Sequence, residues 1–136
     1  MIGVMILTHE TLGKSYTDLA EHFFGQVPAY LSIIGMQPQD NPDTVLEQAI
    51  IEAARLDAGA GVLVLADIFG ATPCNVGRRL LPGRQMVLLA GLNAPMVVKA
   101  LQYAPAAEDL PAFADSVKQA ALAGIMQIEA GECAAC

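Results

Sequence analysis

Residues 2–9 read IGVMILTH and residues 61–67 read GVLVLAD, so two apolar runs each stop at one ionisable residue, His9 in the first and Asp67 in the second. Apolar runs of this length are typical of strands that are buried on both faces of a parallel sheet. The carboxyl ends of such strands line the edge where open α/β sheets form ligand and catalytic sites. The two runs therefore predict an α/β fold whose functional edge carries a histidine and an aspartate.

The rest of the chain alternates helices with strands. Strands are predicted over residues 2–7, 31–36, 61–66 and 85–90, and helices over residues 11–24 and 110–123 and from near Pro42, Thr72 and Asn93 onward. Residues 125–129 are a candidate for a short C-terminal edge strand. This alternation implies a doubly wound, mostly parallel four-stranded sheet with helices on both faces. If the strand order is 2-1-3-4, His9 and Asp67 meet at the point where the winding reverses.

The composition argues against several classes of protein. The 136 residues suffice for one domain, and a net charge of −7 without a basic cluster beyond Arg78-Arg79 argues against nucleic-acid binding. The hydrophobic share is 54%, yet no run reaches the roughly 18 apolar residues of a membrane span, so we expect no direct membrane insertion. Without a basic, signal-like N-terminus, the expected location is cytoplasmic. Cys133 and Cys136 have C-x-x-C spacing, but we interpret them as free thiols of a tail.

A histidine beside an aspartate suggests an oriented, nucleophilic imidazole. In this interpretation Asp67 accepts the Nδ1–H of His9, leaves Nε2 free, and stabilises the positive charge that the ring acquires in attack. The plainer alternatives are a core histidine and an aspartate that caps its own turn. The position of His9 at a sheet edge favours function. His22, by contrast, lies off the apolar stripe of its helix and reads as a solvated residue.

The turn after Asp67 is a candidate anion cradle. Small residues let the backbone approach a ligand, and Thr72 followed by Pro73 is the pattern of a helix N-cap and first turn, whose amides bind anions. An ordinary cap explains this pair equally well, so the anion hypothesis depends on the neighbouring His9. The candidate phosphate-binding residues are Gly70, Ala71, Thr72 and Asn93, the last at another helix start.

These features suit transient phosphorylation of the imidazole. The sequence has no Walker loop or dinucleotide fingerprint, so we expect no cofactor and a phosphoryl group that comes from another protein. It also has no set of metal ligands, and we expect no metal.

Three motifs in order carry a family resemblance: Thr8-His9, residues 67–75 (DIFGATPCN) and residues 91–96 (GLNAPM). They closely resemble mannose-family enzyme IIA of the bacterial phosphotransferase system. The resemblance implies a domain over residues 1–130 with a tail over residues 131–136. It also implies a phosphotransferase that takes a phosphoryl group from phospho-HPr on His9 and passes it to an enzyme IIB of the mannose family, and a homodimer.

Two expectations concern the surroundings of His9. Glu10 stands where the family commonly has glycine, which places a negative side chain near an incoming phosphoryl group. HPr is expected to dock on an apolar rim, with Phe69 and Met96 as its candidates.

Alternatives stay open at this point. The protein could be the phosphoryl-carrying subunit of a dihydroxyacetone kinase, or a phosphorylation-state sensor without a transporter. A receiver-like module phosphorylated on Asp67 would need an acidic pair after the first strand, which Thr8-His9-Glu10 does not supply. A purely structural or regulatory binding domain would take no phosphoryl group on His9.

Overall fold

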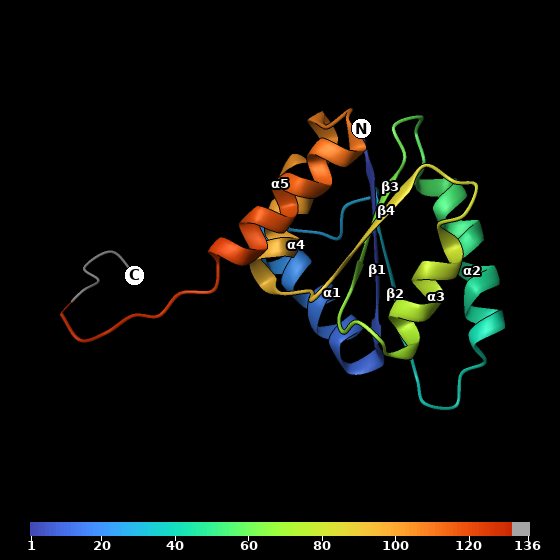
Figure 1. The fold of residues 1–136 in the computed structure, drawn as a ribbon, viewed down its shortest axis with the longest axis horizontal. Coiled ribbons are helices and arrows are strands. Elements are labelled where there is room, and N and C mark those ends of the chain that lie inside the picture. The colour runs from blue at the N-terminus through green and yellow to red at the C-terminus, as the bar shows by residue number, and fades with distance from the viewer. Residues whose placement is uncertain (132–136) are drawn as a thin grey trace.

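The computed structural model describes residues 1–131, so Cys133 and Cys136 lie outside the described residues. Its strands are β1 (Gly3–His9), β2 (Leu31–Met36), β3 (Val62–Ala66) and β4 (Met86–Ala90). They pair in parallel in the order β2-β1-β3-β4 (Figure 1), which confirms the predicted fold and strand order. The winding direction therefore reverses between β1 and β3.

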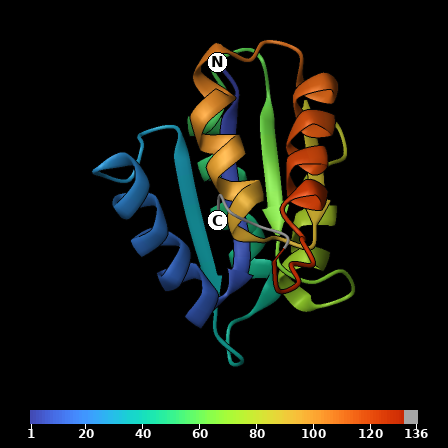
Figure 2. The same ribbon diagram turned by 90° about the vertical axis from the view of Figure 1, so that its left-hand side faces the viewer.

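Helices cover both faces of this sheet. The helices are α1 (Glu10–Phe24), α2 (Pro42–Leu56), α3 (Thr72–Leu80), α4 (Ala94–Tyr103) and α5 (Leu110–Ala123), with a short 3-10 turn at Ala104–Ala106. Figure 1 shows the sheet almost edge-on, with α2 and α3 on one face and α1, α4 and α5 on the other. Figure 2 shows α4 and α5 side by side in front of the central strands.

The apolar run of β1 fills two cores at once, because its side chains alternate between the two faces. Val4 and Ile6 belong to the core under α1, α4 and α5, whereas Met5 and Leu7 belong to the core under α2 and α3. All four are fully buried. Each such side chain contributes on the order of 1.5–3 kcal/mol by leaving water, which is why the run is continuous rather than alternating.

Local signals set the helix boundaries that matter for the site. Asn41 caps α2 by accepting the Asp43 N–H, and Asn93 caps α4 by accepting the Met96 N–H. Gly25 ends α1 in the left-handed conformation at φ 80°, where a side chain would be strained.

The β4 edge differs from the sequence-based expectation. Residues 125–129 form no strand, and they leave α5 as an extended segment that runs away from the body of the domain (Figure 1). A strand needs a partner with free backbone groups, and within this chain the segment does not pair with β4. No helix among residues 1–131 combines the length and apolar character that a membrane span requires.

Candidate functional site

The structure brings His9 and Asp67 together at the carboxyl edge of the two central strands. β1 ends at His9, and Asp67 follows the last residue of β3. His9 Nδ1 lies 2.6 Å from Asp67 Oδ2, and the same oxygen accepts the backbone N–H of His9 at 3.0 Å. Because an ionised carboxylate only accepts hydrogen bonds, Nδ1 carries the proton in this pair. The free lone pair of the neutral ring is therefore on Nε2.

Asp67 is held in a largely buried position. It is only 7% exposed, and its Oδ1 accepts the backbone N–H of Ile68 at 2.9 Å. Burial alone would raise the pKa of Asp67, but the hydrogen bonds from the His9 N–H, the His9 ring and the Ile68 N–H more than offset it and lower that pKa. Asp67 is thus kept ionised and directed at the imidazole.

His9 itself opens toward solvent. Its side chain is 48% exposed and lines a hollow of about 440 Å³ together with Thr72 and Pro73 from α3 and the β2–α2 loop from Met36 to Pro42. Among residues 1–131, Nε2 has no hydrogen bond to another side chain or to the backbone. A group that enters the hollow meets a free ring nitrogen.

The start of α3 faces the same hollow, with one correction to the expected cap. Ala71 is the N-cap and has no side-chain cap bond, so Thr72 is the first helical residue rather than the cap. Gly70 has φ 88°, which lets the chain turn sharply between Asp67 and α3. With no capping side chain in the way, the exposed Thr72 lies at an uncapped helix start next to His9.

Two residues from the 91–96 segment do not line the His9 hollow. Both ends of the Asn93 side-chain amide are occupied, since Oδ1 accepts the Met96 N–H and Nδ2 donates to the Ala121 carbonyl. Asn93 lines a different hollow, between β4 and α5. Met96 is 3% exposed and packs in the core, so its expected place on a docking rim is wrong.

Phe69, expected on the docking rim, is exposed, and sequence reasoning missed two side chains near it, Ile68 and Arg78. Ile68 is 57% exposed and Phe69 is 69% exposed, so both project from the turn after Asp67. The Arg78 guanidinium lies 5.6 Å from the centre of the Phe69 ring. Arg78 lies on α3, nine residues after Phe69 in the sequence. Its side chain reaches this turn because helical side chains lean toward the N-terminus of their helix.

The structure refines the position of Glu10. Its carboxylate rests against β2, where a Cβ on Gly35 would come within 2.6 Å of Glu10 Oε2. Glu10 therefore lies on the β2 side of β1, whereas Asp67 lies on the β3 side.

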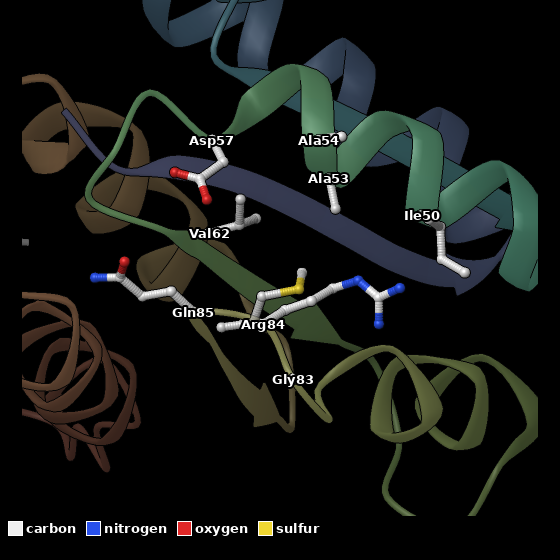
Figure 3. A pocket seen from close by; sticks show the side chains of 9 residues that line it. Ile50, Ala53, Ala54, Asp57, Val62, Gly83, Arg84 and Gln85 are labelled. Carbon is white, nitrogen blue, oxygen red and sulfur yellow. The ribbon is translucent and has the colours of Figure 1, made fainter.

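A third hollow, of about 330 Å³, lies at the opposite end of the sheet (Figure 3). It lies where β3 and β4 begin, and its charged groups are engaged in the fold. Arg84 donates to the Leu80 and Pro82 carbonyls at the end of α3, and Asp57 accepts two backbone N–H groups of the turn before β3. It shares no residue with the His9 hollow.

Comparison with known proteins decides the family. The family model of the PTS system fructose IIA component, EIIA-man, matches residues 3–118. The chain belongs to the EIIA-man family. This mannose-family enzyme IIA is 31% identical over 124 residues to the PTS system mannose-specific EIIAB component of Escherichia coli strain K12. The match covers 90% of this chain but only 37% of that relative.

Solved structures share the fold of this enzyme IIA. The phosphotransferase system component EIIA from Streptococcus agalactiae superposes with a TM-score of 0.83 at 24% identity, covering 93% of this chain and 97% of that one. The mannose/sorbose specific IIA subunit from Enterococcus faecalis gives 0.81 at 22% identity, covering 97% and 98%. At these identities the likeness establishes the architecture of the phosphotransferase component.

Proposed function

We propose that this enzyme IIA is a phosphoryl carrier, in which His9 Nε2 accepts a phosphoryl group from phospho-HPr and passes it to an enzyme IIB. The observation that carries the proposal is the 2.6 Å contact between His9 Nδ1 and Asp67 Oδ2 beside an open hollow. That contact directs the Nε2 lone pair outward and provides a counter-charge for the ring.

The transfer balances as a displacement at phosphorus. The Nε2 lone pair forms the new P–N bond, the P–N bond of the donor's phosphohistidine breaks, and its electron pair returns to the donor's ring nitrogen. The His9 ring, protonated on Nδ1 and phosphorylated on Nε2, carries a positive charge that the buried Asp67 carboxylate stabilises. The second transfer, to enzyme IIB, reverses these steps. The N–H groups at the start of α3, with Thr72, Ala71 and Gly70, are proposed to receive the phosphoryl oxygens.

The partner proteins are proposed to dock on the Ile68–Phe69 surface, defined by these two exposed side chains and Arg78. Ile68 and Phe69 directly follow Asp67, the hydrogen-bond partner of His9. The surface combines two exposed apolar side chains with one guanidinium group. Because this protein has a net charge of −7, we expect the partner to supply the positive charge that attracts the two proteins. The Ile68–Phe69 surface then contributes mainly apolar contact.

Removing the Phe69 ring is expected to weaken HPr binding by about tenfold, the loss that truncation of an aromatic interface residue commonly causes. Isothermal titration of HPr against Phe69→Ala measures it. Ile51→Ala is the matched control, because Ile51 is also 69% exposed but lies on α2 away from the site. Equal HPr affinity in Phe69→Ala and wild type would place the docking surface elsewhere.

We also propose that the protein is a homodimer built on the β4 edge. The β4 residues are only half-buried, and a hollow of about 460 Å³ lies between β4 and α5. The segment that follows α5 exposes Ile125, Met126 and Ile128 by 75%, 74% and 55%. Segment 125–129 of a second copy, paired with β4, would cover the hollow and bury the apolar side chains of the segment. It would also give the unpaired backbone groups of the β4 edge hydrogen-bond partners.

Light scattering is expected to give twice the 14.2 kDa of the chain. The double variant Ile125→Asp, Ile128→Asp should shift the mass toward that of one chain, because burying two unpaired carboxylates in the interface makes association unfavourable. The matched control is Ile51→Asp, on an exposed position of α2. A single-chain mass for wild type across a wide concentration range would refute the dimer.

A further inference from the structure

The hollow of Figure 3, which we call the Arg84 hollow, lies where α3 is too short to cover the sheet. α2 has 15 residues, whereas α3 has nine and ends at Leu80. The starts of β3 and β4 therefore lie between α2 on one side and residues 83–85 on the other (Figure 3). The volume of about 330 Å³ that stays open falls at the lower end of the range of small-molecule pockets, about 300–1,000 Å³.

The floor of the Arg84 hollow is apolar. Val62 at the start of β3 and Ala53 of α2 are buried, and the half-buried Ile50 and Met86 lie beside them. Ile50 and Met86 thus remain partly open to solvent. An alkyl chain laid over them would remove this apolar area from water.

Arg84 offers free hydrogen-bond donors at one end of the hollow. Its Nη1 donates to the Leu80 carbonyl at 3.0 Å and to the Pro82 carbonyl at 3.3 Å, which fixes the guanidinium at the end of α3. Among residues 1–131, Arg84 pairs with no carboxylate, unlike Arg55 and Arg79, and its Nε and Nη2 donate to no other group. These two nitrogens form an edge that matches the two oxygens of a carboxylate.

Asp57 places a negative charge at the other end. Its Oδ1 accepts the N–H groups of Gly59 and Gly61 at 2.8 and 3.0 Å, and its Oδ2 has no hydrogen-bond partner within residues 1–131. Figure 3 shows the Arg84 side chain directed toward Ile50 and the Asp57 carboxylate in the opposite direction. The hollow is therefore cationic at one end, apolar in the middle and anionic at the other end.

We propose that the Arg84 hollow is a binding site for a small aliphatic monocarboxylate. The ligand carboxylate accepts hydrogen bonds from Arg84 Nε and Nη2, and its alkyl chain covers Ile50, Val62 and Met86. Asp57 repels a second anionic group at the far end of the ligand and attracts a cationic one. The site shares no residue with the His9 hollow, so this inference goes beyond phosphoryl transfer and does not depend on it.

Four six-carbon probes test the site in the unaltered protein. Hexanoate titrated into nitrogen-15-labelled protein should shift the amide signals of Ala53, Val62 and Met86, with a Kd on the order of 1–10 mM for so small a ligand. Hexan-1-ol lacks the carboxylate and should bind about tenfold more weakly. 6-Aminohexanoate should bind more tightly than hexanoate, and adipate more weakly, because of Asp57.

Three results with these probes would overturn the proposal. They are the absence of hexanoate-induced shifts at the hollow, equal binding of hexanoate and hexan-1-ol, and tighter binding of adipate than of 6-aminohexanoate.

Arg84→Gln tests the cationic end directly. It should weaken hexanoate binding by about tenfold and leave hexan-1-ol binding unchanged, because only the charged contact is lost. Arg55→Gln is the matched control, since Arg55 lies in the last turn of α2, pairs with Glu52 and does not line the hollow. Unchanged hexanoate binding in Arg84→Gln, or an equal loss in Arg55→Gln, would contradict the proposal. If Arg84→Gln fails to fold by circular dichroism, the comparison of hexanoate with hexan-1-ol in wild type decides the question.

Discussion

His9→Ala is expected to abolish phosphorylation completely. When the protein is incubated with enzyme I, HPr and labelled phosphoenolpyruvate, wild type should take up label and His9→Ala should take up none. The reason is that His9 supplies the only imidazole at the active edge, with its Nδ1 bound to Asp67 and its Nε2 free.

The control for this experiment is the second histidine of the chain. His22 is exposed on α1, where its ring packs edge-on against Phe23, so His22→Ala should label like wild type. Label retained in His9→Ala would exclude His9 as the acceptor. The chemistry of the label gives independent information, because phosphohistidine survives base whereas an acyl phosphate on a carboxylate does not.

Asp67→Asn should slow phosphorylation by about 100-fold while leaving the fold intact. An amide of the same shape keeps an acceptor oxygen but removes the negative charge that fixes the Nδ1–H and stabilises the charged ring, a type of contribution commonly worth about 10²–10⁴. Single-turnover transfer from phospho-HPr measures the rate, and circular dichroism verifies the fold.

The matched control is Asp18→Asn, an equally conservative change at an exposed carboxylate of α1 that pairs with Lys14. It should transfer at the wild-type rate. A wild-type rate in Asp67→Asn would show that the hydrogen bond to the imidazole is structural only.

The same carboxylate couples stability to pH. Because the pKa of Asp67 is lower in the folded protein, its contribution to stability is fully present above the unfolded value of about 3.9 and disappears as pH falls through the folded value. Urea unfolding of wild type and Asp67→Asn should therefore show a stability difference that narrows below about pH 4. A difference that stays constant down to about pH 2 would contradict the lowered pKa.

The fold was predictable from the sequence for a physical reason. A strand buried on both faces must be apolar throughout, so residues 2–7 and 61–66 identified the two central strands directly. Short right-handed crossovers then leave few topologies, and the reversal between β1 and β3 explains why residues 58 positions apart touch.

The parts that could not be predicted depend on the direction of side chains and on partners. Met96 follows an active-edge turn in the sequence, but α4 turns it into the core. A strand over residues 125–129 needs an edge to pair with, and the isolated chain leaves this segment unpaired.

The central claim is that the phosphoryl group sits on Nε2 of His9, and nitrogen-15 NMR of the phosphorylated protein tests it most directly. Phosphorylation should change the signals of one imidazole only, with phosphorus coupled to Nε2 and the proton retained on Nδ1 beside Asp67. Phosphorus coupled to Nδ1, or two unchanged imidazoles in a protein that carries phosphate, would contradict the account.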